Sequence, residues 1–165
     1  MKPSVFPTKI DLPLDVRNKL VDLLNRHLAA LTDLRMQTKH AHWNVKGPHF
    51  YSLHLLFDTL AESLDEPIDE VAERATSLGG LAQGTAQQVA RQSYLPEFPA
   101  TNYDGLAVVV ALVERWAAAA KATREAIDIA NNLGDADTAD LLTGISRNLD
   151  KHLWFLEAHL QGGQI

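Results

Sequence analysis

The sequence predicts an all-α protein with four long helices and one long connection between the second and the third. Apolar residues recur at helical spacing through four segments, and no segment shows the alternating pattern of a strand. Glycine and proline residues gather between these segments, where they end one helix and precede the next.

The first helix is expected to begin at Pro13 and to run to about Ala41. Proline is tolerated in the first turn of a helix, because the N–H that it lacks has no partner there. Residues 1–12 are expected to form a flexible arm, and residues 13–161 a single helical-bundle domain. A stripe of leucines marks one face of the helix: Leu20, Leu23, Leu24, Leu28, Leu31 and Leu34.

The second helix is expected over about residues 48–77, after a Lys-Gly-Pro turn signal and before a pair of glycines at residues 79–80. Pro67 lies inside this segment. It should kink the helix, because proline removes one backbone hydrogen bond from the helical ladder.

Residues 79–101 form a connection that is too long for a tight hairpin and must cross the length of the bundle. A short helix is expected within it at about residues 85–91. The third helix is expected over about residues 103–131, and the fourth from Asp135 or Asp137 to about residue 160. Four helices with one long crossover form the ferritin-like arrangement, which houses iron sites built from carboxylates and histidines.

The composition favours a cation-binding protein. The chain of 165 residues has no cysteine, which excludes disulfides and thiolate metal sites, and its net charge of −6 repels a phosphate backbone. No apolar run is long enough to span a membrane, and the first residues do not resemble a secretory signal. We therefore expect a cytoplasmic protein without a membrane partner, with association with the nucleoid left open.

Two pairs of residues in the second helix have the chemistry of metal ligands. His54 and Asp58 are four residues apart, as are Asp69 and Glu73, so each pair lies on one helical face. Imidazole with carboxylate suits iron, and also zinc or manganese. The centres of the pairs are fifteen residues apart, which is about 22 Å along a helix, too far to share a metal.

Two copies of this helix, packed antiparallel, would bring the two pairs together. Residue n of one chain would face residue 127 − n of the other, with the two-fold axis near Ser63 and Leu64. The spacing therefore predicts a metal site across a homodimer interface, present twice per dimer. His42 joins this site if the chain folds back at residues 46–48 and returns the first helix alongside His54.

The run Lys39-His-Ala-His42-Trp43-Asn44, the pair His54 and Asp58, and the run Asp69-Glu-Val-Ala-Glu73-Arg74 resemble the Dps mini-ferritins, the starvation-induced DNA-protecting proteins. The resemblance continues through residues 74–80, 137–142 and 150–155, and covers roughly residues 20–160. It implies a hollow shell of twelve identical subunits with ferroxidase sites at the two-fold interfaces inside the shell.

In this resemblance His42, His54 and Asp58 come from one chain, and Asp69 and Glu73 from its partner. Each site would hold one or two iron ions, and zinc can substitute. The family oxidises Fe(II), usually with hydrogen peroxide rather than dioxygen, and stores ferric oxide, which protects against oxidative damage. Trp43, beside His42, would either accept stray oxidising equivalents or pack in the interface; these two roles are about equally favoured.

The start of the fourth helix would lie near an acidic three-fold pore that admits Fe(II). Asp140 is the best candidate for this pore, with Asp135 or Asp137 beside it. Acidic residues at this position also complement the helix dipole. Trp116 and Trp154 are expected in the core.

Two other functions fit the sequence less well. A DNA-compacting shell would be favoured by a lysine-rich arm, and this arm carries only Lys2 and Lys9. A haem-binding cage of twenty-four subunits would need Glu-x-x-His pairs on two helices of one bundle, and no matching pairs are found. The choice between peroxide and dioxygen stays open.

Overall fold

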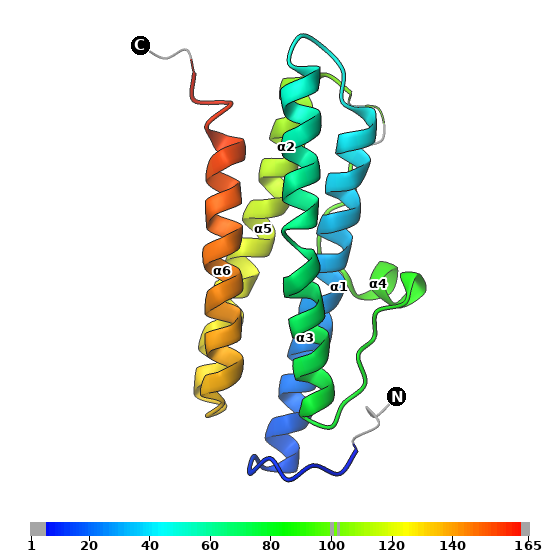
Figure 1. The fold of residues 1–165 in the computed structure, drawn as a ribbon. Helices are drawn as coiled ribbons and strands as arrows, with labels where there is room; N and C mark the ends of the chain where they lie inside the picture. Colours follow the sequence, from blue (N-terminus) through cyan, green and yellow to red (C-terminus); the bar gives the residue numbers. More distant parts are fainter. Residues whose placement is uncertain (1–5, 100, 102, 163–165) are drawn as a thin grey trace.

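The computed structural model describes residues 6–99, 101 and 103–162, and it confirms the all-α, ferritin-like class (Figure 1). The described residues form no strand; an isolated bridge joins Lys46 to Asp104. The crossover carries a short helix, as predicted. The helices are α1 (Leu14–Asn44), α2 (Phe50–Glu62), α3 (Asp65–Ser77), α4 (Ala86–Gln92), α5 (Gly105–Asn132) and α6 (Ala136–Glu157).

The core lies between the long helices. The leucine stripe of α1 is largely buried and packs with Phe57 from α2 and Trp116 from α5. The Trp116 indole N–H lies 3.3 Å from the Thr38 hydroxyl, so this ring has a polar partner inside the core. The expectation for Trp154 was wrong: 59% of this residue is exposed, because it lies on the outer face of α6.

The predicted second helix is divided into α2 and α3, and the division lies at Ser63 and Leu64, one turn before Pro67 (Figure 1). Pro67 has no N–H for the Ser63 carbonyl, and its ring would clash with that carbonyl in a regular helix. The ψ angles of Ser63 and Leu64 are −13° and −11°, compared with about −42° in an α-helix. The regular hydrogen-bond ladder is therefore interrupted between α2 and α3.

The crossover is fastened to the bundle by Arg115, which is only 3% exposed. Its guanidinium donates to the Gln37 side chain at 3.0 Å, to the Ala111 carbonyl at 2.8 Å and to the Glu97 carbonyl. It also lies over the Phe98 ring. One buried cation thus connects α1, α5 and the segment that follows α4.

The described part of the N-terminal arm lies against the end of α3. The Phe6 N–H donates to the Gly79 carbonyl, while Arg17 donates to the carbonyls of Leu12 at 3.2 Å and Leu78 at 3.1 Å. The arm is therefore held at these points in its described part, rather than free along its whole length.

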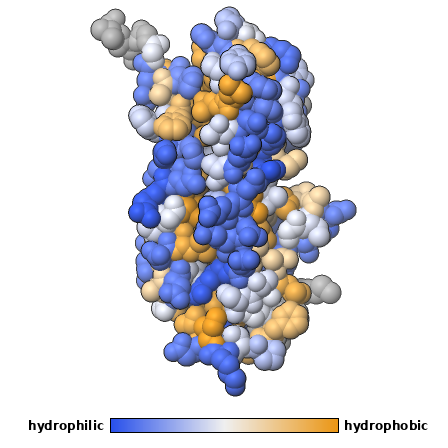
Figure 2. Space-filling view, viewed as in Figure 1, coloured by the Kyte–Doolittle hydropathy of each residue, from blue (hydrophilic) through white to orange (hydrophobic). Residues whose placement is uncertain are grey.

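The surface mixes polar and apolar residues. Figure 2 shows hydrophilic residues along much of the length of one face, with apolar residues between them. Among the helices of the described residues, none is long and apolar enough to cross a membrane.

Candidate metal centre

The structure brings His42 and His54 into direct contact. His42 lies in the last turn of α1 and His54 in the second turn of α2. The turn between the two helices reverses the chain, and the imidazole rings stack with their centroids 3.7 Å apart and their planes 21° from parallel. The approach expected from the turn signal at residues 46–48 is therefore present within one chain.

Two reciprocal hydrogen bonds determine which nitrogen of each ring is available to a ligand. Nδ1 of His42 lies 2.7 Å from the His54 carbonyl oxygen, and Nδ1 of His54 lies 2.8 Å from the His42 carbonyl oxygen. A carbonyl oxygen only accepts, so each Nδ1 carries the hydrogen. The lone pair of each ring is then on Nε2. Backbone carbonyls orient metal-binding histidines in this way.

Asp58 is paired with Lys39 in this structure. The Lys39 ammonium contacts Asp58 Oδ1 from the facing turn of α1. The hydrogen bond from Lys39 is the main cause that lowers the pKa of Asp58, and the nearby His42 and His54 act in the same direction. Sequence reasoning assigned no role to Lys39. Its position three residues before His42 was the available signal, because that spacing places both on one face of α1.

Asp69 and Glu73 lie apart from this cluster, on α3 beyond the break. Both are exposed, and within the described residues neither carboxylate has a hydrogen bond or an ion pair. In the same part of the chain, no group of three or more histidine, aspartate or glutamate side chains is placed to hold a metal ion. Within one chain His42 stacks on His54, and Asp58 follows His54 by one turn on the middle of α2, whereas the other two predicted ligands lie on α3.

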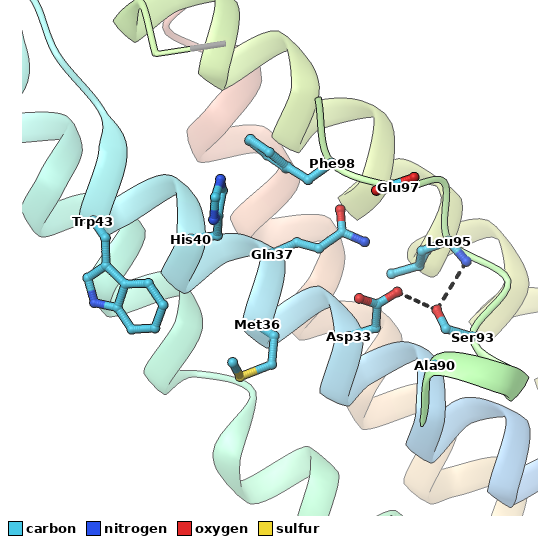
Figure 3. Close-up of a pocket in the computed structure, with 10 residues that line it drawn as sticks. All are labelled: Asp33, Met36, Gln37, His40, Trp43, Ala90, Ser93, Leu95, Glu97 and Phe98. Atoms are coloured by element: carbon cyan, nitrogen blue, oxygen red, sulfur yellow. Dashed lines mark hydrogen bonds between the residues drawn. The ribbon is translucent and has the colours of Figure 1, made fainter. Parts of the chain in front are cut away.

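Trp43 lies outside this cluster and is 58% exposed. Its indole lines a cavity of about 650 Å³ between α1 and the crossover, together with Met36, His40 and Phe98 (Figure 3). The ring is therefore accessible in the single chain. Its role in accepting oxidising equivalents or in packing stays a prediction.

The three acidic pore candidates differ in their surroundings. Asp135 is 4% exposed, caps α6 and accepts two hydrogen bonds from Arg74 at 2.8 and 2.9 Å. Burial alone would raise the pKa of Asp135, but the hydrogen bonds from Arg74 and Thr138 outweigh burial and lower it. Asp137 is mostly exposed, and Asp140 is exposed beside a cavity of about 320 Å³ between α3 and α6.

The comparisons with known proteins agree with this architecture. Residues 21–164 match the family described as a ferritin-like domain. The DNA protection during starvation protein of Agrobacterium fabrum is 45% identical, over 93% of this chain and 95% of that protein. The structure of DpsA14 from Streptomyces coelicolor has a TM-score of 0.92 and 32% identity, and the match covers 100% of this chain and 99% of that one.

A Dps protein from Vibrio cholerae O1 matches with a TM-score of 0.87 and 27% identity, over 98% of both chains. Its structure is described as a member of a broad superfamily of ferritin-like diiron-carboxylate proteins. The helical architecture and the family match over residues 21–164 place the chain in the ferritin-like class. Within that class, the chain belongs to the Dps family, the DNA protection during starvation proteins.

The buried pair of Arg74 and Asp135 gives a stability prediction. Arg74→Met leaves a buried carboxylate without its cation, which should lower the free energy of unfolding by about 3–5 kcal/mol. Because the pKa of Asp135 is lowered by folding, its contribution is present above the usual value near 4 and is lost as pH falls through the folded value. Arg74→Met should therefore also flatten the acid limb of the stability profile.

Denaturant unfolding across pH measures both effects. The matched control is Arg124→Met, because Arg124 forms an exposed ion pair with Asp150 at 2.7 Å. This exposed pair should contribute roughly 1 kcal/mol or less. Equal, small losses in the two variants would show that the Arg74 pair has no special structural role.

Proposed function

We propose that this chain is a ferroxidase that oxidises Fe(II) between two-fold related subunits and stores ferric iron in a hollow shell of twelve copies. The observation that carries this proposal is the division of the ligand candidates. Two oriented histidines lie beside the middle of α2, which carries Asp58, while Asp69 and Glu73 on α3 have no hydrogen bond or ion pair to their carboxylates among the described residues. An antiparallel second copy would place one group against the other.

The proposed donor set suits iron as a substrate. Nε2 of His42 and of His54 supplies neutral nitrogen ligands, and the three carboxylates supply oxygen ligands and negative charge. Before iron binds, the Lys39 ammonium neutralises Asp58. An incoming Fe(II) ion would replace this ammonium, so the carboxylate need not stand unpaired in the empty site.

Paired oxidation gives a balanced reaction. Two Fe(II) ions each lose one electron, and hydrogen peroxide takes both electrons and two protons to form two water molecules. The O–O bond is thereby cleaved without release of a hydroxyl radical. Trp43 would either intercept an oxidising equivalent that escapes this pairing or pack in the interface. Dioxygen is the other candidate oxidant.

Iron would reach the interior through an acidic three-fold channel at the start of α6. Asp140 is the main candidate, with Asp137 beside it, because both are exposed to solvent. Asp135 is held by Arg74 inside the chain and therefore supports the start of α6 rather than a channel wall. Full negative charges at this position would concentrate cations at the channel mouth.

DNA compaction is the alternative function that the names of the relatives suggest. The net charge of −6 per chain corresponds to 12 × −6 = −72 for twelve copies. Such a shell would repel DNA unless a basic patch compensated locally. The observations therefore favour iron oxidation over DNA compaction.

Mixed shells test whether the site needs two chains. The first variant, His54→Ala with Asp58→Ala, lacks one half of the site, and the second variant, Asp69→Ala with Glu73→Ala, lacks the other. Shells of either variant alone should be inactive. In shells reassembled from equal amounts of both, about one quarter of the sites should be complete, because half of the interfaces are mixed and each mixed interface regains one site.

Peroxide-dependent Fe(II) oxidation in stopped flow measures this recovery, with shell size checked by light scattering. Each variant reassembled with itself is the control. No recovery in the mixed shells, with active wild-type shells prepared in the same way, would show that each site is formed within one chain.

Lys39 gives a second test of the site. Lys39→Met removes the cation that competes for Asp58, so the affinity for Zn²⁺ should rise several-fold. Lys121→Met is the matched control, since Lys121 faces Glu125 on the exposed surface of α5. Calorimetric titration with Zn²⁺ decides the result. A loss of affinity in Lys39→Met alone would mean that Lys39 supports metal binding rather than competing with it.

A further inference from the structure

The break between α2 and α3 is enclosed by polar contacts from α6. The Asn148 side-chain amide donates to the Ser63 carbonyl at 3.4 Å. The Ser63 hydroxyl donates to the Leu60 carbonyl at 2.7 Å, and Nδ1 of His152 lies 3.2 Å from the same hydroxyl oxygen. Because the hydroxyl hydrogen is used, His152 Nδ1 is the donor in this contact. We call Ser63, Leu64, Asn148 and His152 the joint.

Pro67 explains why the joint needs these contacts. In a regular helix the Ser63 carbonyl would accept from the N–H of residue 67, which proline lacks. A carbonyl without a donor is costly inside a protein, and Asn148 supplies one. His152 is itself buried, at 8% exposure, and meets the Trp116 ring edge-on at 5.7 Å.

The start of α3 is also held from the opposite side. Asp65, the first residue of α3, forms an ion pair with Arg35 from α1. The direction of α3 relative to α2 is therefore set by contacts from both α1 and α6, and not by the continuity of one helix.

The joint separates the two groups of proposed ligands. His54 and Asp58 precede it on α2, and Asp69 and Glu73 follow it on α3. Glu73 lies nine residues beyond Leu64, which is about 14 Å along the helix. A tilt of ~10° at the joint would therefore move Glu73 by about 2.4 Å, more than a whole metal–ligand bond of about 2.1 Å.

We propose that the joint is a positioning element, which sets α3 at the angle that lets Asp69 and Glu73 meet the His54 and Asp58 of a second copy. This inference rests on the proposed function. Pro67, Asn148 and His152 act through the direction of α3 and do not touch the metal. Since the two-fold axis would pass near Ser63 and Leu64, the two joints of a dimer would lie next to one another.

Pro67→Ala separates positioning from stability. Alanine restores the N–H at residue 67, so the Ser63 carbonyl can rejoin the helical ladder and α2 can run straight into α3. The assembled variant shell should bind Co²⁺ at least tenfold more weakly and with a changed visible absorption spectrum, although the helix itself is more regular. Pro13→Ala, at the start of α1, is the control for loss of a proline elsewhere. It should leave the Co²⁺ affinity and the visible spectrum unchanged.

His152→Phe and His152→Asn form a matched pair. Phenylalanine keeps the packing on Trp116 but loses the donor to Ser63, so Co²⁺ affinity should fall and the spectrum should change. Asparagine keeps a donor near the position of Nδ1, so His152→Asn should restore much of the Co²⁺ affinity and much of the wild-type spectrum. A role of His152 in packing alone predicts the opposite order, with phenylalanine the better replacement.

Wild-type and Asp58→Ala shells distinguish failure of the proposed function from failure of the positioning role of the joint. If wild-type shells do not bind Co²⁺, or bind it as Asp58→Ala shells do, the proposed function fails. If wild-type shells bind through Asp58 while Pro67→Ala and His152→Phe shells keep the wild-type affinity and spectrum, the proposed function stands and the positioning role of the joint is overturned.

Discussion

The rise of the α-helix is the constraint on which the candidate site depends. Four of the five proposed ligands lie on the consecutive helices α2 and α3. They form two pairs whose centres are fifteen residues apart. This separation is about 22 Å in a straight helix, so one chain cannot close the site along these helices. That distance divides the donor set into two groups and makes a second copy necessary. It also makes the break at Ser63 important, because the break lies between the two groups.

Within one chain, the structure prepares each half of the site in a different way. The imidazoles of His42 and His54 are fixed by each other's backbone carbonyls, which leaves both Nε2 atoms as acceptors. Asp58 is kept charged by Lys39. Asp69 and Glu73 instead remain solvated on α3. A charged group that stays solvated until its partner arrives avoids the cost of burial without compensation.

The sequence predicted features that depend on local periodicity. The leucine stripe predicted α1, and the turn at residues 46–48 predicted the approach of His42 to His54. The ligand roles of the pairs with four-residue spacing stay a prediction. Contacts between distant segments were not accessible in this way. Arg74 reaches Asp135 across sixty-one residues, and Lys39 reaches Asp58 only because α1 and α2 pack side by side. Pro67 predicted a kink, but its effect falls on Ser63, the carbonyl four residues earlier.

Anomalous diffraction from crystals of the shell soaked with Zn²⁺ tests the two-chain site most directly. The account predicts a peak at each two-fold interface, within about 2.0–2.2 Å of ligand atoms from His42, His54 and Asp58 of one subunit and from Asp69 and Glu73 of the partner subunit. A peak bound by residues of a single subunit would contradict it. So would a dimer in which the two ligand pairs remain more than about 10 Å apart at every interface.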